Sequence, residues 1–472
     1  MTHHDCDICI IGGGSGGLSL AAGAAQMGAK ILLFESGAMG GDCLNSGCVP
    51  SKALLAAAKA AHYATGAPRM GVIGAPPQID FPSVKAHVAE VIDGIAPHDS
   101  IERFEALGVT VISENAAFRG PREVASENHK VRAKYFVIAT GSFPDIPQIN
   151  GLSEVDFYTN ETIFADPTKP DCLVIIGGGP IGIEMAQAHA RLGVDVTVIE
   201  AVSIMAPDDI ELVDMLKTQL ESDGVKFIEG VSVAYVRQTK SREITLILAN
   251  GVAIEASHIL VATGRRPDID RLNLPAAGVK FGKTGIVTDQ RLRTSNKRVY
   301  AIGDVTGRQQ FTHMASYHAS ICLRNVLFKY PAKIDETAVP WVTYCDPELA
   351  HVGLTHDAAI DRLGRENVMV TRWDLADNDR ARADHRTNGM LKAVIHKNGR
   401  ILGASILAPM AGEIIQPWIL AIANRQKIAN LATMIAPYPT YGEASKRAAG
   451  NFFTAKLFGK PTQKLVRFLL KF

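Results

Sequence analysis

Residues 7–17 read Asp-Ile-Cys-Ile-Ile-Gly-Gly-Gly-Ser-Gly-Gly, and they decide the fold of this chain. An apolar run typical of a buried strand leads into the spacing Gly12-x-Gly14-x-x-Gly17. Residues 18–29 then favour a helix of small side chains, and a second apolar strand over residues 31–34 ends in Glu35. Glycines at this spacing let a pyrophosphate approach the helix N-terminus, and the acidic residue accepts hydrogen bonds from a ribose. Together these parts predict a dinucleotide-binding unit.

The same pattern recurs in residues 172–182, with the spacing Gly177-x-Gly179-x-x-Gly182. A helix is expected through Arg191, and a strand over residues 194–200 ends in Glu200. Two such sites in one chain predict a nicotinamide donor at one and FAD at the other. A carboxylate at Glu200 favours the free 2′-OH of NADH over the 2′-phosphate of NADPH, and residues 201–208 hold no Arg. NADH is therefore the expected donor.

Two cysteines, Cys43 and Cys48, follow the first glycine motif in the run GDCLNSGCVPSK of residues 41–52. Residues five apart in a regular helix rise about 7.5 Å, whereas the Cα atoms of a disulfide lie roughly 4.4–6.8 Å apart. The pair can bridge only across an irregular turn, which Gly47 permits, and Pro50 suits the start of the next helix. The alternatives are half of a metal site or two unrelated buried thiols. The neighbouring dinucleotide motifs favour a labile redox pair.

The composition of the chain limits the number of domains, the kinds of partner and the cellular location that we expect. A length of 472 residues favours about three domains, and 49 basic against 48 acidic residues offer no electrostatic case for nucleic acid. Neither a signal peptide nor an apolar run of the roughly 18 residues of a membrane span is expected. Seven scattered cysteines predict a reducing, cytoplasmic location. Three of them lie in apolar runs and are expected to be buried core residues: Cys6, Cys9 and Cys172.

The order of these motifs resembles that of the FAD-dependent pyridine nucleotide-disulfide oxidoreductases, which include dihydrolipoamide dehydrogenase, glutathione reductase and mercuric reductase. The resemblance covers nearly the whole chain and extends to Ala139-Thr-Gly141, Ala262-Thr-Gly264-Arg-Arg-Pro267, Tyr300-Ala-Ile-Gly-Asp304 and Asp346-Pro-Glu348. It implies an α/β fold with two Rossmann-like dinucleotide-binding domains, for FAD and NAD, and a C-terminal α+β dimerisation domain. The expected domains are residues 1–152 with 285–335 for FAD, 153–284 for NAD(P), and 336–472 for dimerisation.

The resemblance also implies roles for individual residues in an NAD(P)H-dependent FAD-containing disulfide reductase. Cys48 would be the thiol nearest the flavin and would form the charge-transfer thiolate, and Cys43 would be the interchange thiol that attacks the substrate. Lys52 would approach flavin N5 and pair with Glu184. The flavin itself would be bound through its ribityl chain at Asp304 and its pyrimidine ring at Ala315.

The C-terminal motif His-Pro-x-x-x-Glu, which supplies the partner subunit with a base in many members, reads Tyr438-Pro-Thr-Tyr-Gly-Glu443 here. Histidine titrates near neutral pH, whereas tyrosine has an ordinary pKa of about 10. Mercuric reductases resemble the chain in this tyrosine, and residues 378–382 and 411–413 are similar to a mercuric-reductase-like subgroup. We expect the protein to have neither their C-terminal cysteine pair nor their N-terminal heavy-metal domain. We therefore expect a homodimer with a small disulfide or a soft metal ion as acceptor, and no resident metal.

Some alternatives stay open at this point. The missing histidine also fits a redox-responsive dimeric binding component with weak catalysis, although retention of the other site residues argues against it. Cys345 stands where relatives often have Thr, and its use as a substitute thiol is the less favoured interpretation. A helix over residues 464–472 would carry its basic residues on one face. That pattern fits contact with a membrane surface, but packing on the dimerisation domain is favoured.

Overall fold

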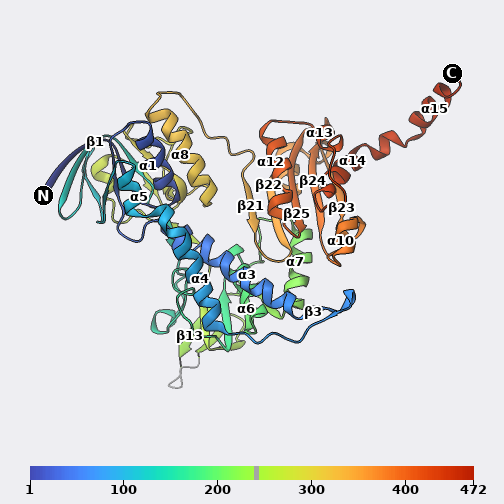
Figure 1. Cartoon of the computed structure of the whole chain (residues 1–472), viewed down its shortest axis with the longest axis horizontal. Helices are drawn as coiled ribbons and strands as arrows, with labels where there is room; N and C mark the ends of the chain where they lie inside the picture. The colour runs from blue at the N-terminus through green and yellow to red at the C-terminus, as the bar shows by residue number, and fades with distance from the viewer. Residues whose placement is uncertain (239–243) are drawn as a thin grey trace. The chain divides into compact units, whose positions relative to one another are not determined.

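The computed structural model describes residues 1–238 and 244–472, and these residues form two units (Figure 1). Unit 1 contains residues 1–57, 78–177 and 232–335, and unit 2 contains residues 58–77, 178–231 and 336–472. The three domain ranges expected from the sequence stay a prediction.

Unit 1 is built on a mainly parallel sheet that begins with the first glycine motif. Strand β1 (Thr2–Ile11) lies between β2 (Ile31–Phe34) and β8 (His129–Ile138), and it pairs in parallel with both. The order is β5-β2-β1-β8-β7-β6, completed by β5 (Val109–Ile112), β6 (Ala117–Gly120) and β7 (Glu123–Ala125). Strand β20 (Val299–Ala301) also pairs with β8, so a distant segment joins the same sheet. Helix α1 (Ser15–Gln26) packs against α8 (Thr312–Val326), as Figure 1 shows.

The C-terminal half of strand β1, from Ile8 to Ile11, is buried on both faces. Ile8 and Ile10 enter one hydrophobic core, and Cys9 and Ile11 enter the other. A strand covered on both sides reads as a continuous apolar run, which is why its sequence shows no alternation. Cys6 is buried as well, as predicted.

The second glycine motif follows β10 (Cys172–Ile176), which pairs in parallel with β16 (His258–Val261) in unit 1. The prediction that Cys172 is buried was wrong: it is the first residue of β10 and only half-buried, with its Sγ 3.4 Å from the carbonyl oxygen of Glu255. In unit 2, α6 (Pro180–Arg191) precedes β11 (Asp195–Glu200), and β11 pairs in parallel with β12 (Val225–Glu229). Helix α7 (Ile210–Ser222) connects these two strands.

The C-terminal part of unit 2 is a five-stranded antiparallel sheet in the order β21-β22-β25-β24-β23. Its strands are β21 (Pro340–Thr343), β22 (Glu348–Gly353), β23 (Val368–Asp374), β24 (Met390–His396) and β25 (Ile401–Ala408). The fully buried Trp418 of α12 (Gln416–Ala423) anchors the core, and its Nε1 donates to Ser445 Oγ of α14 (Glu443–Leu457) at 3.0 Å.

The remaining longer elements complete the two units. Unit 1 also holds α4 (Phe81–Ile95), α5 (Ile101–Ala106) and an antiparallel sheet of β13 (Val233–Gln238), β14 (Ile244–Leu248) and β15 (Ala253–Ala256). Unit 2 also holds α9 (His356–Leu363), α10 (Asp379–Ala383), α13 (Ile428–Ala432) and α15 (Lys460–Leu469). Every residue of α15 is described and none is buried, so the favoured packing of this tail on the dimerisation domain is not found within the chain.

Candidate functional site

The two predicted redox cysteines lie in different helices. Cys43 is in α2 (Gly41–Asn45), and Cys48 is the first residue of α3 (Cys48–Ala64). The predicted irregular turn between them is therefore confirmed, although α3 begins two residues before Pro50. Gly47 is needed for space, because a Cβ there would lie 2.9 Å from the carbonyl oxygen of Asp42. Both cysteines are thiols, with Cys43 half-buried and Cys48 exposed.

The two thiols have opposite electrostatic environments. A hydrogen bond with Cys43 lowers the pKa of Cys48, and Thr312 and the charge of Lys52 lower that pKa further. The Thr312 Oγ1 atom lies 3.2 Å from Cys48 Sγ. The helix N-terminus at which Cys48 sits also favours a thiolate. The same hydrogen bond, together with burial, raises the pKa of Cys43. These environments favour the thiolate form at Cys48 over Cys43.

A chain of polar contacts joins the cysteine turn to Asp304. Asp42 accepts a hydrogen bond from Asn160 Nδ2 at 2.9 Å and pairs with Arg265 Nη2 at 3.3 Å. Arg265 Nε donates to Ser142 Oγ at 2.9 Å, and Ser142 Oγ donates to Asp304 Oδ2 at 2.7 Å. Burial raises the pKa of Asp304. Of these residues the sequence marked only Asp304 as a site residue, although Arg265 and Ser142 each stand next to a quoted motif glycine.

The first glycine turn has the geometry that a dinucleotide requires. Gly12 has a φ of 110°, and a Cβ there would overlap the carbonyl oxygen of Ala139. A Cβ on Gly17 would overlap the carbonyl oxygen of Gly12, so the turn and the helix approach too closely for any side chain. Gly14 is the N-cap of α1 and has no side chain with which to cap the first turn. The N-terminal N–H groups of α1 can therefore bind a phosphate.

Glu35 and Glu200 occupy equivalent positions in the two motifs. Glu35 accepts hydrogen bonds from the backbone N–H of Gly13 at 2.5 Å and of Gly37 at 2.7 Å. Glu200 accepts from the backbone N–H of Gly178 at 2.8 Å and of Val202 at 3.0 Å. A carboxylate has four acceptor positions, so each retains capacity for ribose hydroxyls. This donor set and the open helix termini fit the dinucleotides that the sequence predicts.

The other predicted cofactor residues lie around the same turns. Gly177 has a φ of 114°, and a Cβ there would overlap the carbonyl oxygen of Ala262. Gly141 and Gly264, with φ values of 74° and 141°, end the strand-turn motifs after β8 and β16. The remaining three belong to helices: Gly179 is the N-cap of α6, Gly182 is buried within α6, and Ala315 is buried in α8.

Lys52 and Glu184 are each placed, but in different units. Lys52 lies one helical turn after Cys48 in α3, where its charge favours the Cys48 thiolate. Glu184 is buried in α6, and its Oε1 accepts a hydrogen bond from the backbone N–H of Tyr344 at 2.9 Å. The pairing of Lys52 with Glu184 stays a prediction.

The C-terminal candidate Glu443 begins α14, and the other candidate, Tyr438, lies five residues before it. The exposed Tyr438 hydroxyl donates to Asp379 Oδ2 at 2.8 Å, and this hydrogen bond raises the pKa of Tyr438. The fraction of Tyr438 that is ionised at neutral pH, and so able to act as a base, is therefore smaller than for a free tyrosine. Glu443, the first residue of α14, accepts from Arg447 Nε at 2.8 Å. Cys345 is 2% exposed, which argues against its use as a substitute thiol.

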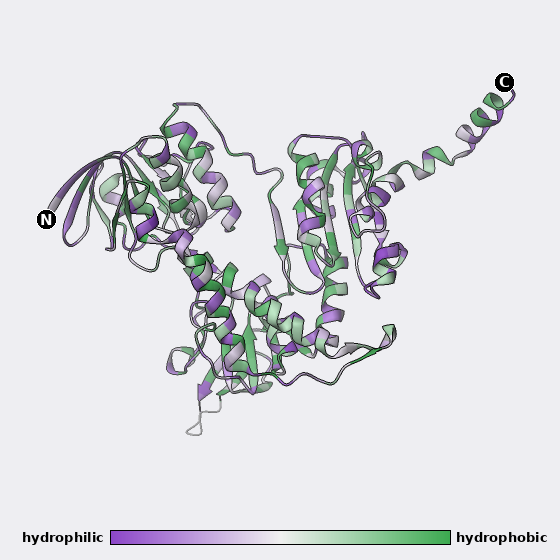
Figure 2. Ribbon diagram, viewed as in Figure 1, coloured by the Kyte–Doolittle hydropathy of each residue, from purple (hydrophilic) through white to green (hydrophobic). Residues whose placement is uncertain are grey.

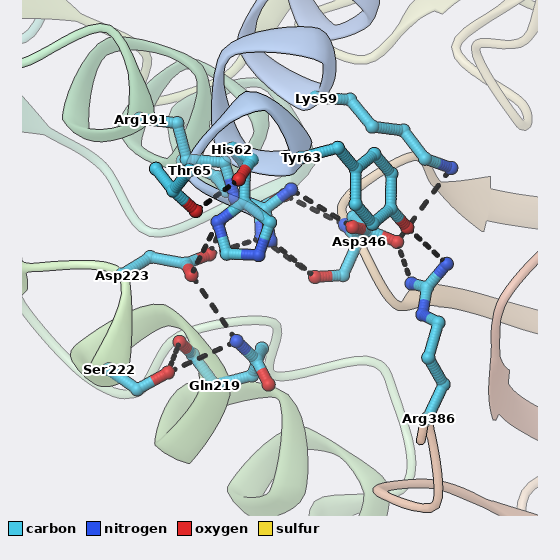
Figure 3. Close-up of polar contacts among 11 residues, drawn as sticks. Lys59, His62, Tyr63, Thr65, Arg191, Gln219, Ser222, Asp223, Asp346 and Arg386 are labelled. Atoms are coloured by element: carbon cyan, nitrogen blue, oxygen red, sulfur yellow. Dashed lines mark hydrogen bonds and ion pairs between the residues drawn. The ribbon is translucent and has the colours of Figure 1, made fainter. Parts of the chain in front are cut away.

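A buried ion cluster in unit 2 surrounds the motif carboxylate Asp346 (Figure 3). Arg191 bridges two carboxylates, with Nε 2.9 Å from Asp223 and Nη1 3.0 Å from Asp346. Arg386 pairs with Asp346 and donates to the hydroxyl of Tyr63 at 2.6 Å. Burial opposes ionisation of Asp346, but Arg386 and Arg191 outweigh it and lower its pKa. Through Arg386 the cluster binds Tyr63, which lies near the C-terminal end of α3. Cys48 is the first residue of the same helix.

Comparisons with known proteins show the family and the fold of the chain. Residues 6–319 match the family model described as pyridine nucleotide-disulphide oxidoreductase, and residues 339–449 match the model of its dimerisation domain. The chain is 34% identical over 453 residues to a mercuric reductase of Staphylococcus aureus, covering 95% of this chain and 82% of that relative. It is 32% identical over 456 residues to a dihydrolipoyl dehydrogenase of Geobacillus stearothermophilus, covering 94% and 96% respectively.

A solved structure has the same fold. The Cu(II) complex of the HOCl-induced flavoprotein disulfide reductase RclA from Escherichia coli aligns with a TM-score of 0.84 at 26% identity, covering 93% of this chain and 99% of that one. The expected α/β class with a C-terminal dimerisation domain is confirmed. Within the described ranges, no helix has the length and apolar character needed to cross a bilayer.

Proposed function

The chain belongs to the pyridine nucleotide-disulphide oxidoreductase family, and within it we propose an NADH-dependent reductase that uses Cys43 and Cys48 to reduce a small disulfide or a soft metal ion. The family places the chain among NAD(P)H-dependent FAD enzymes, as predicted. The observation that carries the finer proposal is the asymmetry of the thiols: the pKa of Cys48 is lowered and that of Cys43 is raised.

Bound FAD would accept a hydride from the nicotinamide and supply an electron pair to the cysteine disulfide. Two electrons and one proton convert that disulfide to a Cys48 thiolate and a Cys43 thiol. The Cys43 thiol transfers its proton to the Cys48 thiolate and attacks a substrate disulfide as a thiolate. The departing substrate sulfur takes that proton from Cys48, and a mixed disulfide remains on Cys43. The Cys48 thiolate displaces the second substrate sulfur as a thiolate and restores the Cys43–Cys48 bond.

The acceptor class is inferred from the altered C-terminal motif and from the relatives. Tyr438, with its raised pKa, is a poor base for taking a proton from a dithiol. This disfavours rapid turnover of dihydrolipoamide. It favours acceptors that react with a cysteine thiolate of the enzyme without a proton transfer through Tyr438. A mercuric reductase is among the relatives, and the solved structure is a Cu(II) complex. These two similar proteins support metal ions, in addition to small disulfides, as candidate acceptors for this chain.

Donor choice, assembly and location complete the proposal. Glu200, held by two backbone N–H groups, supports NADH because a 2′-phosphate would approach its carboxylate. The matched dimerisation domain supports a homodimer in which Tyr438 and Glu443 serve the partner's site. The cytoplasmic location stays a prediction from cysteine usage.

The function is tested by an acceptor panel with the purified FAD-loaded enzyme. NADH and NADPH oxidation are followed separately with glutathione disulfide, Hg(II) and Cu(II), and the reduction of NAD is followed with dihydrolipoamide. Cys48→Ala and Cys43→Ala are expected to lose at least about 99% of turnover, because each removes one sulfur of the relay. Cys172→Ala, a half-buried thiol outside the site, is the matched control and retains activity.

Three results would contradict the proposal. Full turnover by Cys48→Ala would exclude the relay, and a strong NADPH preference would overturn the role of Glu200. Background rates with every acceptor would instead favour the redox-responsive binding component. An anaerobic NADH titration supplies an independent check, since a long-wavelength absorption band is expected after two electrons in wild type and not in Cys48→Ala.

A further inference from the structure

The C-terminal helix α15 has an exposed apolar stripe. Leu465, Phe468 and Leu469 of α15, with Phe472 three residues after its last residue, follow the i, i+3, i+4, i+7 spacing of one helix face, with exposed fractions of 56%, 56%, 57% and 97%. Figure 2 shows apolar and polar residues along this helix, which extends beyond the strands of the dimerisation domain. An apolar stripe exposed over its whole length indicates a surface that is covered by something outside the chain.

A neighbouring face of the same helix is positively charged. Lys460, Lys464, Arg467 and Lys471 recur at spacings of three and four residues, so they form one stripe. Residues 444–472 contain seven Lys and Arg residues and no Asp or Glu, whereas the whole chain is nearly balanced at 49 basic and 48 acidic. The ligand of this tail is therefore expected to carry negative charge next to an apolar layer.

A second copy of the chain fits this helix poorly. The match to the family's dimerisation domain ends at residue 449, before α15 begins at Lys460. A stable interface buries about 800 Å² per partner, more than one stripe of four side chains provides. Two basic stripes would also repel each other. The surface of an anionic lipid bilayer has both properties, negative charge and an adjacent apolar layer.

We propose that α15 is a membrane-surface helix that binds anionic lipid. The apolar stripe enters the boundary between headgroups and acyl chains, and the Lys and Arg side chains extend to the lipid phosphates. The helix is short and basic, so it lies along the surface. The enzyme is thereby attached peripherally, whichever acceptor its cysteines reduce.

Vesicle flotation of the full-length FAD-loaded enzyme tests the proposal. Two kinds of vesicle are compared. One contains phosphatidylcholine with about 30% phosphatidylglycerol, which gives it the negative surface of an anionic leaflet, and the other contains phosphatidylcholine alone. Wild type is expected to float with the anionic vesicles, and 0.5 M salt, at which the Debye length falls to roughly 4 Å, is expected to release it. Lys464→Glu/Arg467→Glu is expected to lose roughly tenfold or more in binding, and Phe468→Ser/Leu469→Ser is expected to lose a similar factor.

Matched controls separate a local effect from general charge or stability. Lys397→Glu/Arg400→Glu reverses two exposed charges at the same spacing elsewhere in unit 2, and Ile435→Ser removes a side chain that is 96% exposed. Both are expected to float like wild type, and all variants are expected to keep NADH oxidation. Absence of flotation by wild type, equal binding to neutral vesicles, or loss in the controls would overturn the proposal. A lower oligomeric mass of the α15 variants in light scattering would also overturn it, in favour of a second copy.

Discussion

Thr312 lies 264 residues after Cys48 in the sequence, yet its Oγ1 atom is 3.2 Å from the Cys48 sulfur. As the first residue of α8 it is placed there by the packing of α8 against α1. Nothing in the motif around Cys48 marks Thr312, because the contact depends on how two distant segments meet. Its hydroxyl is one of the groups that lower the pKa of Cys48.

Replacing Thr312 with Val is expected to raise the pKa of Cys48, because the thiolate loses a hydrogen-bond donor. A bond of about 1 kcal/mol corresponds to roughly 0.7 of a pH unit. Only the thiolate is alkylated, so the rise of the Cys48 alkylation rate with pH is expected to move to higher pH. Mass spectrometry of the reduced enzyme treated with iodoacetamide measures this at Cys48 alone.

The control for this substitution is Thr312→Ser, which keeps the hydroxyl and removes only a methyl group. Its alkylation profile is expected to match that of wild type. A profile for Thr312→Val that stays in place, or a Ser variant displaced as far as the Val variant, would show that the hydroxyl does not tune Cys48.

At the scale of elements, the ion cluster around Arg191 joins the C-terminal end of α6 to the segment after β21. The Arg191 side chain is 4% exposed and that of Asp223 is 2% exposed, so the charges are desolvated and depend on one another. The pKa of Asp346 is lowered in the folded state. Its contribution to stability is therefore complete above its unfolded pKa of about 3.9 and is lost as the pH falls through the lower folded pKa.

Arg191→Met is expected to destabilise unit 2 by roughly 3–5 kcal/mol, because it leaves two buried carboxylates without their shared cation. The matched control is Lys226→Met, which breaks an exposed ion pair with Asp195 and is expected to cost less than about 1 kcal/mol. Thermal unfolding at neutral pH measures both as falls in Tm. Equal Tm values for the two variants would mean that the cluster does not stabilise the unit.

At the scale of the whole molecule, the proposed assembly is a homodimer with shared active sites. Light scattering is expected to give twice the 50.6 kDa mass of one chain. Glu443 is tested by hybrid dimers of a Cys48→Ala chain with a Glu443→Gln chain, each inactive by itself. If Glu443 serves the partner, one site collects both defects, and the other is intact and gives about half of wild-type activity.

The hybrid experiment has a clear opposite outcome. If Glu443 serves the site of its own chain, both sites of the hybrid carry one defect, and no activity returns. A hybrid of Cys48→Ala with an unmodified chain is the control, and it retains one intact site in either case. An active Glu443→Gln homodimer would remove Glu443 from the catalytic machinery altogether.

The fold class and the local geometry of several candidate site residues could be predicted from the sequence. The glycine turns, the strands that precede them, the acids Glu35 and Glu200 and the break between Cys43 and Cys48 all depend on short continuous segments. Their geometry follows from backbone sterics and apolar periodicity, which are local properties. For the same reason the resemblance to a reductase family was readable, and the matches over residues 6–319 and 339–449 confirm it.

Only the tertiary structure decided which distant groups meet. It placed Thr312 beside Cys48, joined Arg265 to Asp304 through Ser142, and left Cys172 at the start of a strand instead of in a core. It also showed that α15, whose amphipathic pattern is plain in the sequence, has no buried residue among those described. A sequence pattern predicts which kind of surface a helix presents. Whether another part of the chain covers that surface depends on the order of the strands and the length of the connections. A local pattern contains neither.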